Sequence, residues 1–304
     1  MRINSNLAKV ATLALTVGYI GLANAELNIF ACEPEYAALA QELAPDAQIY
    51  SATTAMQDPH QVQARPSLIA KMRQADLAVC AGADLEVGWL PMLQMKSSNA
   101  KVRSTDQGLF FAAEHANTLD KLESVDRSMG DVHAQGNPHL HFSPLRVLKV
   151  AEALTAKLIA LDPVSQNQYQ TAFDEFSRKW TQAIPLWEAK AAPLKGQKVI
   201  AYHSNFRYLF DWVGIEQVGD LEPKPGLPPS SRHLASLLKR AETDDIMAII
   251  VASYQSERGA EWLGERAKLP VQVLPMSVGG NDESQDLFSL YDSVIDLLLQ
   301  FQTR

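Results

Sequence analysis

Short apolar runs alternate with amphipathic segments in the first third of the chain. The apolar runs, typical of buried strands of a parallel sheet, lie at 27–31, 48–51 and 77–81. Segments with helical spacing of their apolar residues lie at 33–43, from Pro66 onward, and at 83–90. Strand and helix alternating with short connections predict right-handed βαβ units on a parallel sheet.

The same alternation returns after Gly196. Strands are predicted at 199–202, 246–252 and 271–274. Helices are predicted at 206–213, from the capping residue Ser230 to 241, at 257–267, and over the closing stretch that contains Leu287, Leu290, Ile295 and Leu298. A second parallel sheet with flanking helices is therefore expected.

Between these halves the pattern is helical. Apolar residues recur with helical spacing over 145–161, and a longer segment over 165–190 is rich in Gln, Glu, Lys, Phe and Trp. It contains Pro185, so it is either kinked or two helices end to end. The predicted fold is α/β, with two lobes, each a parallel sheet flanked by helices, joined by a long connecting helix. The expected boundaries are a signal peptide over 1–25, an amino-terminal lobe over 26–160, the connecting helix over 161–195 and a carboxy-terminal lobe over 196–304.

The first residues have the order of a secretory signal peptide. Arg2 and Lys9 precede an uncharged apolar stretch over 10–22, and Ala23-Asn24-Ala25 offers a small-x-small cleavage site. The stretch is short for a membrane span, and no later segment reaches the length that a span requires. Since Cys32 lies well past that site, a soluble periplasmic protein without a lipid anchor is expected.

The net charge of the chain restricts the kinds of partner that it is expected to bind. The whole chain has a formal net charge of −8, and removal of the two basic residues of the leader makes the mature part still more acidic. An acidic surface argues against nucleic acid as a partner and is compatible with collecting cations.

The two cysteines are placed alike. Cys32 and Cys80 end the first and third predicted strands, which are neighbours in the common 2-1-3-4 order. An oxidising compartment permits a disulfide between them. Two small buried thiols remain the alternative.

Three histidines fall where open parallel sheets bind ligands, beyond the carboxyl ends of strands. His203 follows the strand at 199–202, His60 lies in the loop after the second strand, and His139 ends the turn-rich segment at 136–139. They come from both lobes, so a shared site in the cleft between the lobes is the hypothesis. Imidazole nitrogens suit Zn²⁺ and neighbouring divalent metals. The spacing forms no HExxH or CxxC motif, so three unrelated histidines remain the alternative.

Several short motifs occur together in a recognisable order. They are Asp58-Pro59-His60 with Ala64-Arg65-Pro66-Ser67, Ala75-Asp76-Leu77 with Gly82 to Glu86, Gly136-Asn137-Pro138-His139, Ala201-Tyr202-His203 with Phe206 and Tyr208, Leu221-Glu222-Pro223, and the helix start over 228–234. In these motifs the sequence resembles the cluster A-I family, the zinc- and manganese-binding substrate-binding proteins of ABC transporters. The resemblance covers nearly all of the mature chain.

The resemblance implies a metal ion held in the interlobe cleft by His60, His139 and His203. Manganese-selective relatives often have a carboxylate at the third position, so a histidine at 203 favours Zn²⁺ over Mn²⁺. It also implies delivery of the ion to an ABC transporter permease in the inner membrane, by a protein expected to be a monomer. A manganese-binding homologue is the alternative.

Two departures from the family pattern leave questions open. The family commonly supplies an aspartate after the last strand, but residues 274–280 contain no carboxylate before Asp282. Water, His141, Asp282 or Glu283 are the alternatives for a fourth ligand. The long His-rich loop of many zinc-uptake proteins is also missing. His115 and His133, the histidines of 112–135, are expected to be exposed loop residues, with capture of metal on its way to the site as the alternative.

An enzyme is the competing class. Three histidines and a water also form the zinc centre of hydrolases. The sequence shows neither a general base beside the metal nor a substrate pocket, so a binding protein rather than an enzyme is expected. A periplasmic zinc enzyme and an interaction protein with a structural metal remain as alternatives.

Overall fold

The computed structural model describes residues 26–126, 129–130 and 132–301. The expected signal peptide at 1–25 lies outside these ranges. Within them, no helix combines the length and apolar character needed to cross a membrane.

The amino-terminal lobe is built on a parallel sheet of four strands in the order β2-β1-β3-β4. The strands are β1 Asn28–Ala31, β2 Gln48–Ser51, β3 Leu77–Cys80 and β4 Leu109–Phe111. The helices are α1 Pro34–Leu43, α2 Pro66–Gln74 and α3 Leu90–Ser97. Every residue of β3 is buried, as expected for a central strand covered on both faces.

The carboxy-terminal lobe repeats this arrangement, with the strand order β6-β5-β7-β8 and parallel pairing throughout. Its strands are β5 Lys198–Ala201, β6 Glu216–Asp220, β7 Ile246–Ala252 and β8 Val271–Leu274. Its helices are α6 Arg207–Val213, α7 Ser231–Ala241, α8 Arg258–Ala267 and α9 Leu287–Leu299. As predicted, Ser230 caps α7, and its side chain accepts a hydrogen bond from the amide of His233.

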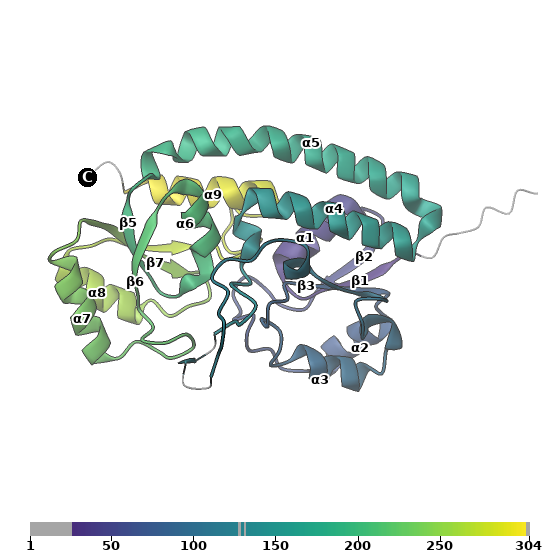
Figure 1. Cartoon of the computed structure of the whole chain (residues 1–304), viewed down its shortest axis with the longest axis horizontal. Coiled ribbons are helices and arrows are strands. Elements are labelled where there is room, and N and C mark those ends of the chain that lie inside the picture. The colour runs from purple at the N-terminus through teal and green to yellow at the C-terminus, as the bar shows by residue number, and fades with distance from the viewer. Residues whose placement is uncertain (1–25, 127–128, 131, 302–304) are drawn as a thin grey trace, which may run out of the picture.

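Two helices connect the sheets. These are α4 Pro144–Leu161 and α5 Gln166–Ala191, and α5 runs across both lobes along one side of the molecule (Figure 1). Pro185 lies inside α5, so the predicted connector is one continuous helix rather than two end to end. The fold class, two parallel sheets flanked by helices with a long helix between them, is confirmed.

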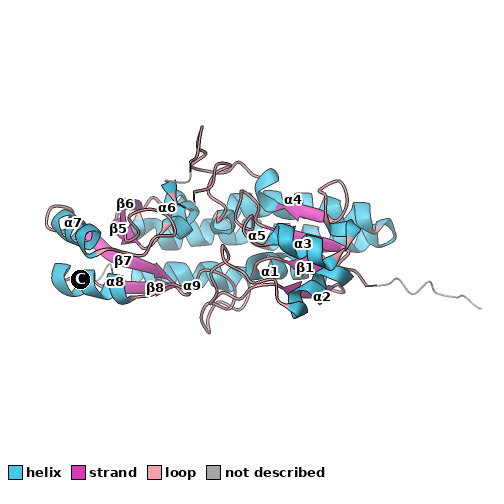
Figure 2. Ribbon diagram, turned by 90° about the horizontal axis from the view of Figure 1, so that it is seen from below, coloured by secondary structure: helices cyan, strands magenta, loops and turns pink. Residues whose placement is uncertain are grey.

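One hydrophobic core is shared by both lobes. It joins the inner faces of the two sheets to α1, α4, α5 and α9. Trp180 of α5 lies at its centre, fully buried, and its indole Nε1 donates to the carbonyl of Pro144 at 2.9 Å. Two smaller cores lie on the outer faces, one beneath α2 and α3 and the other beneath α7 and α8. The two separate sheets, each with its own helices, are visible from below in Figure 2.

Three local predictions were wrong or incomplete. Strands β4 and β6 were not predicted: β4 has three residues, and β6 reads Glu-Gln-Val-Gly-Asp with no apolar run. The segment 83–90 does not form the predicted helix, because Ala83 and Asp84 adopt left-handed backbone angles with φ of 48° and 66°. That conformation interrupts a right-handed helix, and α3 begins only at Leu90.

The side chain of Glu86 explains this turn. Its carboxylate folds back and accepts hydrogen bonds from the amides of Ala81 at 2.7 Å and Gly82 at 3.1 Å. The glutamate therefore closes the turn after β3 instead of placing a charge in the first turn of a helix.

Cys32 and Cys80 form a disulfide, as expected from their strand positions. Their Cα atoms are 4.8 Å apart, since β1 and β3 are hydrogen-bonded neighbours. Both side chains are fully buried. The bond therefore joins two central strands of the amino-terminal lobe from inside the core.

Removal of this disulfide should destabilise the protein strongly. The bond closes a loop with a sequence separation of 48 residues, for which chain entropy predicts a loss of about 4 kcal/mol. We expect the double variant Cys32→Ala/Cys80→Ala to unfold at a clearly lower urea concentration than the wild type. Equal unfolding midpoints in parallel titrations would contradict a stabilising role for this bond.

A pair of buried carboxyl groups lies beside the disulfide. Glu33 and Glu86 both accept from the Ala81 amide, and both are almost completely buried. Burial, followed by the charges of Glu86 and Glu35, holds the pKa of Glu33 well above its usual range. Burial also raises the pKa of Glu86 to about 7, although hydrogen bonds oppose this shift. The pair therefore keeps a proton in the folded state at pH values where an unfolded chain has lost it.

This proton makes stability depend on pH. A pKa raised by folding contributes stability below the unfolded value of about 4.3, and that contribution is lost as pH rises through the folded value. We expect the unfolding free energy to decrease between pH 5 and pH 8. Glu33→Gln keeps a hydrogen-bond donor beside Glu86. In this variant the unfolding free energy should depend less steeply on pH, by the equivalent of up to about one bound proton.

Chemical denaturation at several pH values measures this slope. Asp84→Asn, which removes a carboxylate from the same turn, provides the matched control and should retain the wild-type slope. A Glu33→Gln slope equal to that of the wild type would mean that the buried pair holds no extra proton.

Candidate metal centre

Three histidines meet between the lobes. His60 lies in the loop after β2, His139 precedes the short helix η4 Leu140–Phe142, and His203 lies between β5 and η7 Ser204–Phe206. One ring nitrogen from each lies within 4.8 Å of the others. The ring centroids are 5.8, 6.0 and 6.3 Å apart, and the rings are steeply inclined to one another. The structure thus brings together all three histidines that the sequence singled out.

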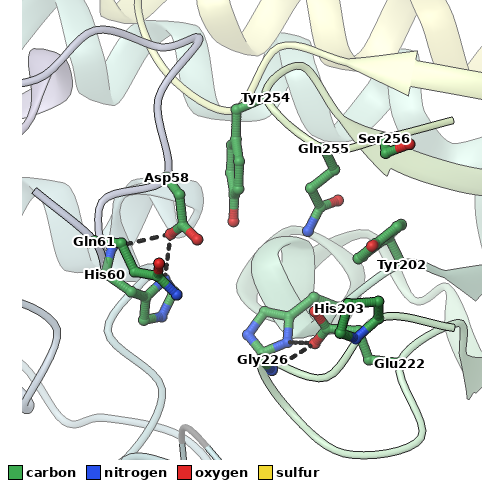
Figure 3. Close-up of a pocket in the computed structure, with 11 residues that line it drawn as sticks. Asp58, His60, Gln61, Tyr202, His203, Glu222, Gly226, Tyr254, Gln255 and Ser256 are labelled. Atoms are coloured by element: carbon green, nitrogen blue, oxygen red, sulfur yellow. Dashed lines mark hydrogen bonds and ion pairs between the residues drawn. The ribbon is translucent and has the colours of Figure 1, made fainter.

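The His60 ring is held by Asp58. The Asp58 carboxylate accepts from both the backbone amide of His60 at 3.0 Å and its ring Nδ1 at 2.8 Å (Figure 3). Burial would raise the pKa of Asp58, but the hydrogen bonds from His60 outweigh it and lower the pKa. A carboxylate only accepts, so Nδ1 carries the proton and the lone pair of a neutral ring is on Nε2. Trp89 fixes the same loop by donating from Nε1 to the carbonyl of Pro59 at 2.9 Å.

His203 has an equivalent partner in the other lobe. Its Nδ1 donates to Glu222 Oε2 at 2.9 Å, and the same oxygen accepts from the amide of Gly226 at 3.1 Å (Figure 3). Both side chains are largely buried. Nε2 of a neutral His203 ring is therefore also left with its lone pair, as in the carboxylate–histidine pairs that support metal sites.

His139 is the most deeply buried of the three, with 1% of its surface exposed. No group among the described residues hydrogen-bonds its buried Nε2. Burial, followed by the nearby His60 and His203, holds the pKa of His139 well below its usual range. A buried nitrogen without a hydrogen-bond partner is unusual, and a metal ion bound at this nitrogen would satisfy it.

Asn137 positions the His139 segment against the other lobe. Its side-chain oxygen accepts from the His139 amide at 2.9 Å, while its Nδ2 donates to the carbonyl of Ser204 at 2.9 Å. The Tyr208 hydroxyl donates to the Asn137 carbonyl at 2.7 Å. One amide side chain therefore links the backbone beside His139 to the residue that follows His203.

His60 and His203 border an open cleft of about 260 Å³. Asp58, His60 and Gln61 line it from one lobe, and Tyr202, His203 and Tyr254 face them from the other (Figure 3). Solvent and small ions therefore reach the site from between the lobes.

His141 supports the site from behind. Its Nε2 donates to the carbonyl of Met276 at 3.0 Å. Its Nδ1 lies 3.1 Å from Glu35 Oε1, a close electrostatic contact without hydrogen-bond geometry. Since both ring nitrogens face other groups, His141 is not available as the fourth ligand.

The loop after β8 does not supply a carboxylate either. Asp282 and Glu283 are exposed, and neither joins the three histidines in a group of close ligand atoms within the described ranges. The segment around them closes on itself, with the Gly279 amide donating to the carbonyl of Ser284 at 2.6 Å.

The expectation of an exposed His133 was wrong. The residue is partly buried, and its Nε2 lies 3.2 Å from Nε2 of His60. Burial, with the neighbouring His60 and His203, lowers the pKa of His133 to about 3. Its presence in the same loop as His139 was the one indication in the sequence. His115, by contrast, is exposed as expected, and its ring stacks on that of Phe110 with the centroids 4.5 Å apart.

A second close group of potential ligands consists of Cys32, Cys80 and Glu86. The two sulfurs are joined in the disulfide. They offer no thiolates, so this group is structural in the oxidised protein.

Comparisons with known proteins agree with this architecture. The family model for the zinc-uptake complex component A, periplasmic (ZnuA), matches residues 29–300. The high-affinity zinc uptake system protein ZnuA of Bacillus subtilis is 24% identical over 237 residues, which cover 75% of this chain and 71% of that protein. The manganese ABC transporter substrate-binding lipoprotein PsaA of Streptococcus pneumoniae is 22% identical over 250 residues, covering 79% and 77% of the two chains.

Solved structures show the same fold. A crystal structure of ZnuA superposes with a TM-score of 0.76 at 19% identity, covering 92% of this chain and all of that one. The Mn-bound periplasmic metal binding protein of Candidatus Liberibacter asiaticus gives a TM-score of 0.72 at 17% identity, covering 90% of this chain and all of that one.

The family model extends from the first strand of the amino-terminal lobe to the end of α9. Its members are metal-binding components of transporters rather than enzymes. The chain therefore belongs to the periplasmic zinc-uptake complex component A (ZnuA) family.

Proposed function

We propose that this protein captures Zn²⁺ in the interlobe cleft with His60, His139 and His203 and delivers it to an ABC transporter permease. The observation that carries the proposal is that ring nitrogens of three histidines lie within 4.8 Å of one another, and that one of these residues, His139, has a buried Nε2 with no hydrogen-bond partner among the described residues. Neutral imidazoles are the form that binds metal. The lowered pKa of His139 keeps that ring neutral at physiological pH.

The donor set favours zinc over manganese. Nitrogen ligands suit Zn²⁺, whereas Mn²⁺ prefers carboxylate, carbonyl and water oxygens. In this site the carboxylates of Asp58 and Glu222 contact the Nδ1 atoms of the histidines. As outer partners they strengthen imidazole as a donor without themselves supplying the oxygen ligands that would favour manganese.

We propose that the protein functions in the periplasm. The family model is described as periplasmic, and the leader over 1–25 has the composition of an export signal.

A single core shared by the lobes limits how far they separate. Small movements of the loops at the cleft are therefore the expected route for loading and release.

Calorimetric titration of chelator-stripped protein with Zn²⁺ and Mn²⁺ tests the proposal. We expect one tight zinc site and much weaker manganese binding. In His203→Ala, zinc affinity should fall by more than the roughly 10–100-fold that loss of an outer partner causes.

His233→Ala is the matched control for this titration. His233 lies on α7 of the same lobe, and its Nε2 bonds to the carbonyl of Asp220 rather than facing the cleft. Unchanged zinc affinity in His203→Ala, or absence of tight binding in the wild type, would overturn the proposal.

Glu222→Gln tests the outer partner separately. The amide can still accept from His203 Nδ1 but lacks the charge that strengthens the imidazole as a donor. We expect zinc affinity to fall about 10–100-fold with no change in stoichiometry, as measured by competition with a chromogenic chelator. Glu216→Gln, at an exposed position of β6, should bind zinc like the wild type; an equal loss in both variants would point to a general electrostatic effect.

A further inference from the structure

His133 reaches the metal centre from a loop that is held in place at several points. The His133 carbonyl accepts from the amide of Gly136 at 3.1 Å. The next residue, Ala134, accepts from the Leu122 amide at 3.2 Å, and Gln135 accepts from the Thr118 hydroxyl at 2.5 Å. The segment around His133 is therefore tied to the chain at 118–122.

The ring of His133 contacts two groups of the protein. It forms a hydrogen bond to the backbone of Ala83, one of the two residues with a left-handed conformation in the turn after β3. Its Nε2 points at His60. This contact with His60 brings His133 to the edge of the site, because the group of ligand atoms within 4.8 Å of one another contains His60, His139 and His203 but not His133.

The distance between His133 and His60 fits two ligands of one small ion. With Zn–N bonds of about 2.0–2.1 Å, two nitrogens of a tetrahedral site lie ~3.3 Å apart. The two Nε2 atoms are 3.2 Å apart. The Nδ1 proton of His60 is fixed by Asp58, so its Nε2 offers a lone pair to the space that His133 also faces.

We propose that His133 shifts from its contact with His60 onto the captured ion as the fourth protein ligand, so that four imidazoles enclose the ion and exclude water from its coordination shell. This inference rests on the proposed function, and it assigns the position that the loop after β8 leaves open. A site of four nitrogens further favours zinc and its borderline neighbours over manganese. His133 thereby becomes a residue that determines metal specificity.

Substitution of Co²⁺ for Zn²⁺ makes the coordination shell visible, because its d–d absorption depends on ligand number and on bound solvent. If four imidazoles bind the ion, the spectrum of the wild-type complex should not respond to azide or to pH between 7 and 9. In His133→Ala a water enters the open position, and metal-bound water near zinc-type sites ionises near pH 7. That spectrum should therefore change with azide and with pH.

Calorimetry of the same proteins gives the second readout. Zinc affinity should fall at least about 10-fold in His133→Ala, while manganese affinity should change little. The preference for zinc over manganese should therefore decrease. His133→Gln, which retains a hydrogen-bonding side chain in the loop, should behave in the same way. His115→Ala, the matched loop control, should match the wild type in every measurement.

The outcomes separate this inference from the proposed function. Tight zinc binding by the wild type, weakened in His203→Ala but unchanged in both His133 variants, would overturn the role of His133 alone. A wild-type cobalt spectrum that already responds to azide would overturn it as well. A wild type that binds neither ion would overturn both proposals.

Discussion

The shared core beneath α5 is the constraint on which the geometry of the site depends. Tyr291 of α9 stacks on Trp187 of α5 at 4.7 Å and contacts Trp180 edge-on at 5.3 Å. The hydroxyl of the same tyrosine donates to the carbonyl of His141 at 2.7 Å. The aromatic packing that joins the lobes therefore also fixes the segment carrying His139. Because close-packed interiors deform little, the distance between the carboxyl ends of the two sheets is set by this core rather than by a bound ion.

Around this fixed core, carboxylates lie next to the histidines of the metal centre rather than among the nitrogens that face one another. Asp58 and Glu222 each bind the far nitrogen of a histidine, and Glu35 lies behind His141. Each carboxylate increases the electron density of an imidazole and fixes its orientation without occupying a position that faces the other rings. Among the described residues His139 has no such partner on its buried Nε2, and burial, followed by the nearby His60 and His203, lowers the pKa of that ring. The lowered pKa of His139 means that this ring binds a cation without first having to release a proton at neutral pH.

The sequence predicted the parts of this arrangement that depend on local patterns. Apolar runs located the central strands, and the ends of those strands located His60 and His203. The turn after β3 was predicted incorrectly, because its left-handed residues are stabilised by Glu86 folding back onto the Ala81 and Gly82 amides, which no periodicity reveals. His133 was misjudged for a similar reason. Its position depends on hydrogen bonds between 118–122 and 134–135, and contacts between distant segments leave no local pattern.

The loop after β8 supplies no ligand to the metal centre, and we assign that role to the loop of His133. In the family pattern noted from the sequence, an aspartate after the last strand commonly completes the metal site. Here the corresponding backbone is committed elsewhere: Met276 accepts from His141, and the Ser277 hydroxyl donates to the buried carboxylate of Glu35. Those contacts hold the loop against α1, so a carboxylate as far along as Asp282 stays in solvent. His133 approaches from the amino-terminal lobe, beside His60. An oxygen donor replaced by an imidazole on the opposite side shifts the site toward the ligand set that zinc prefers.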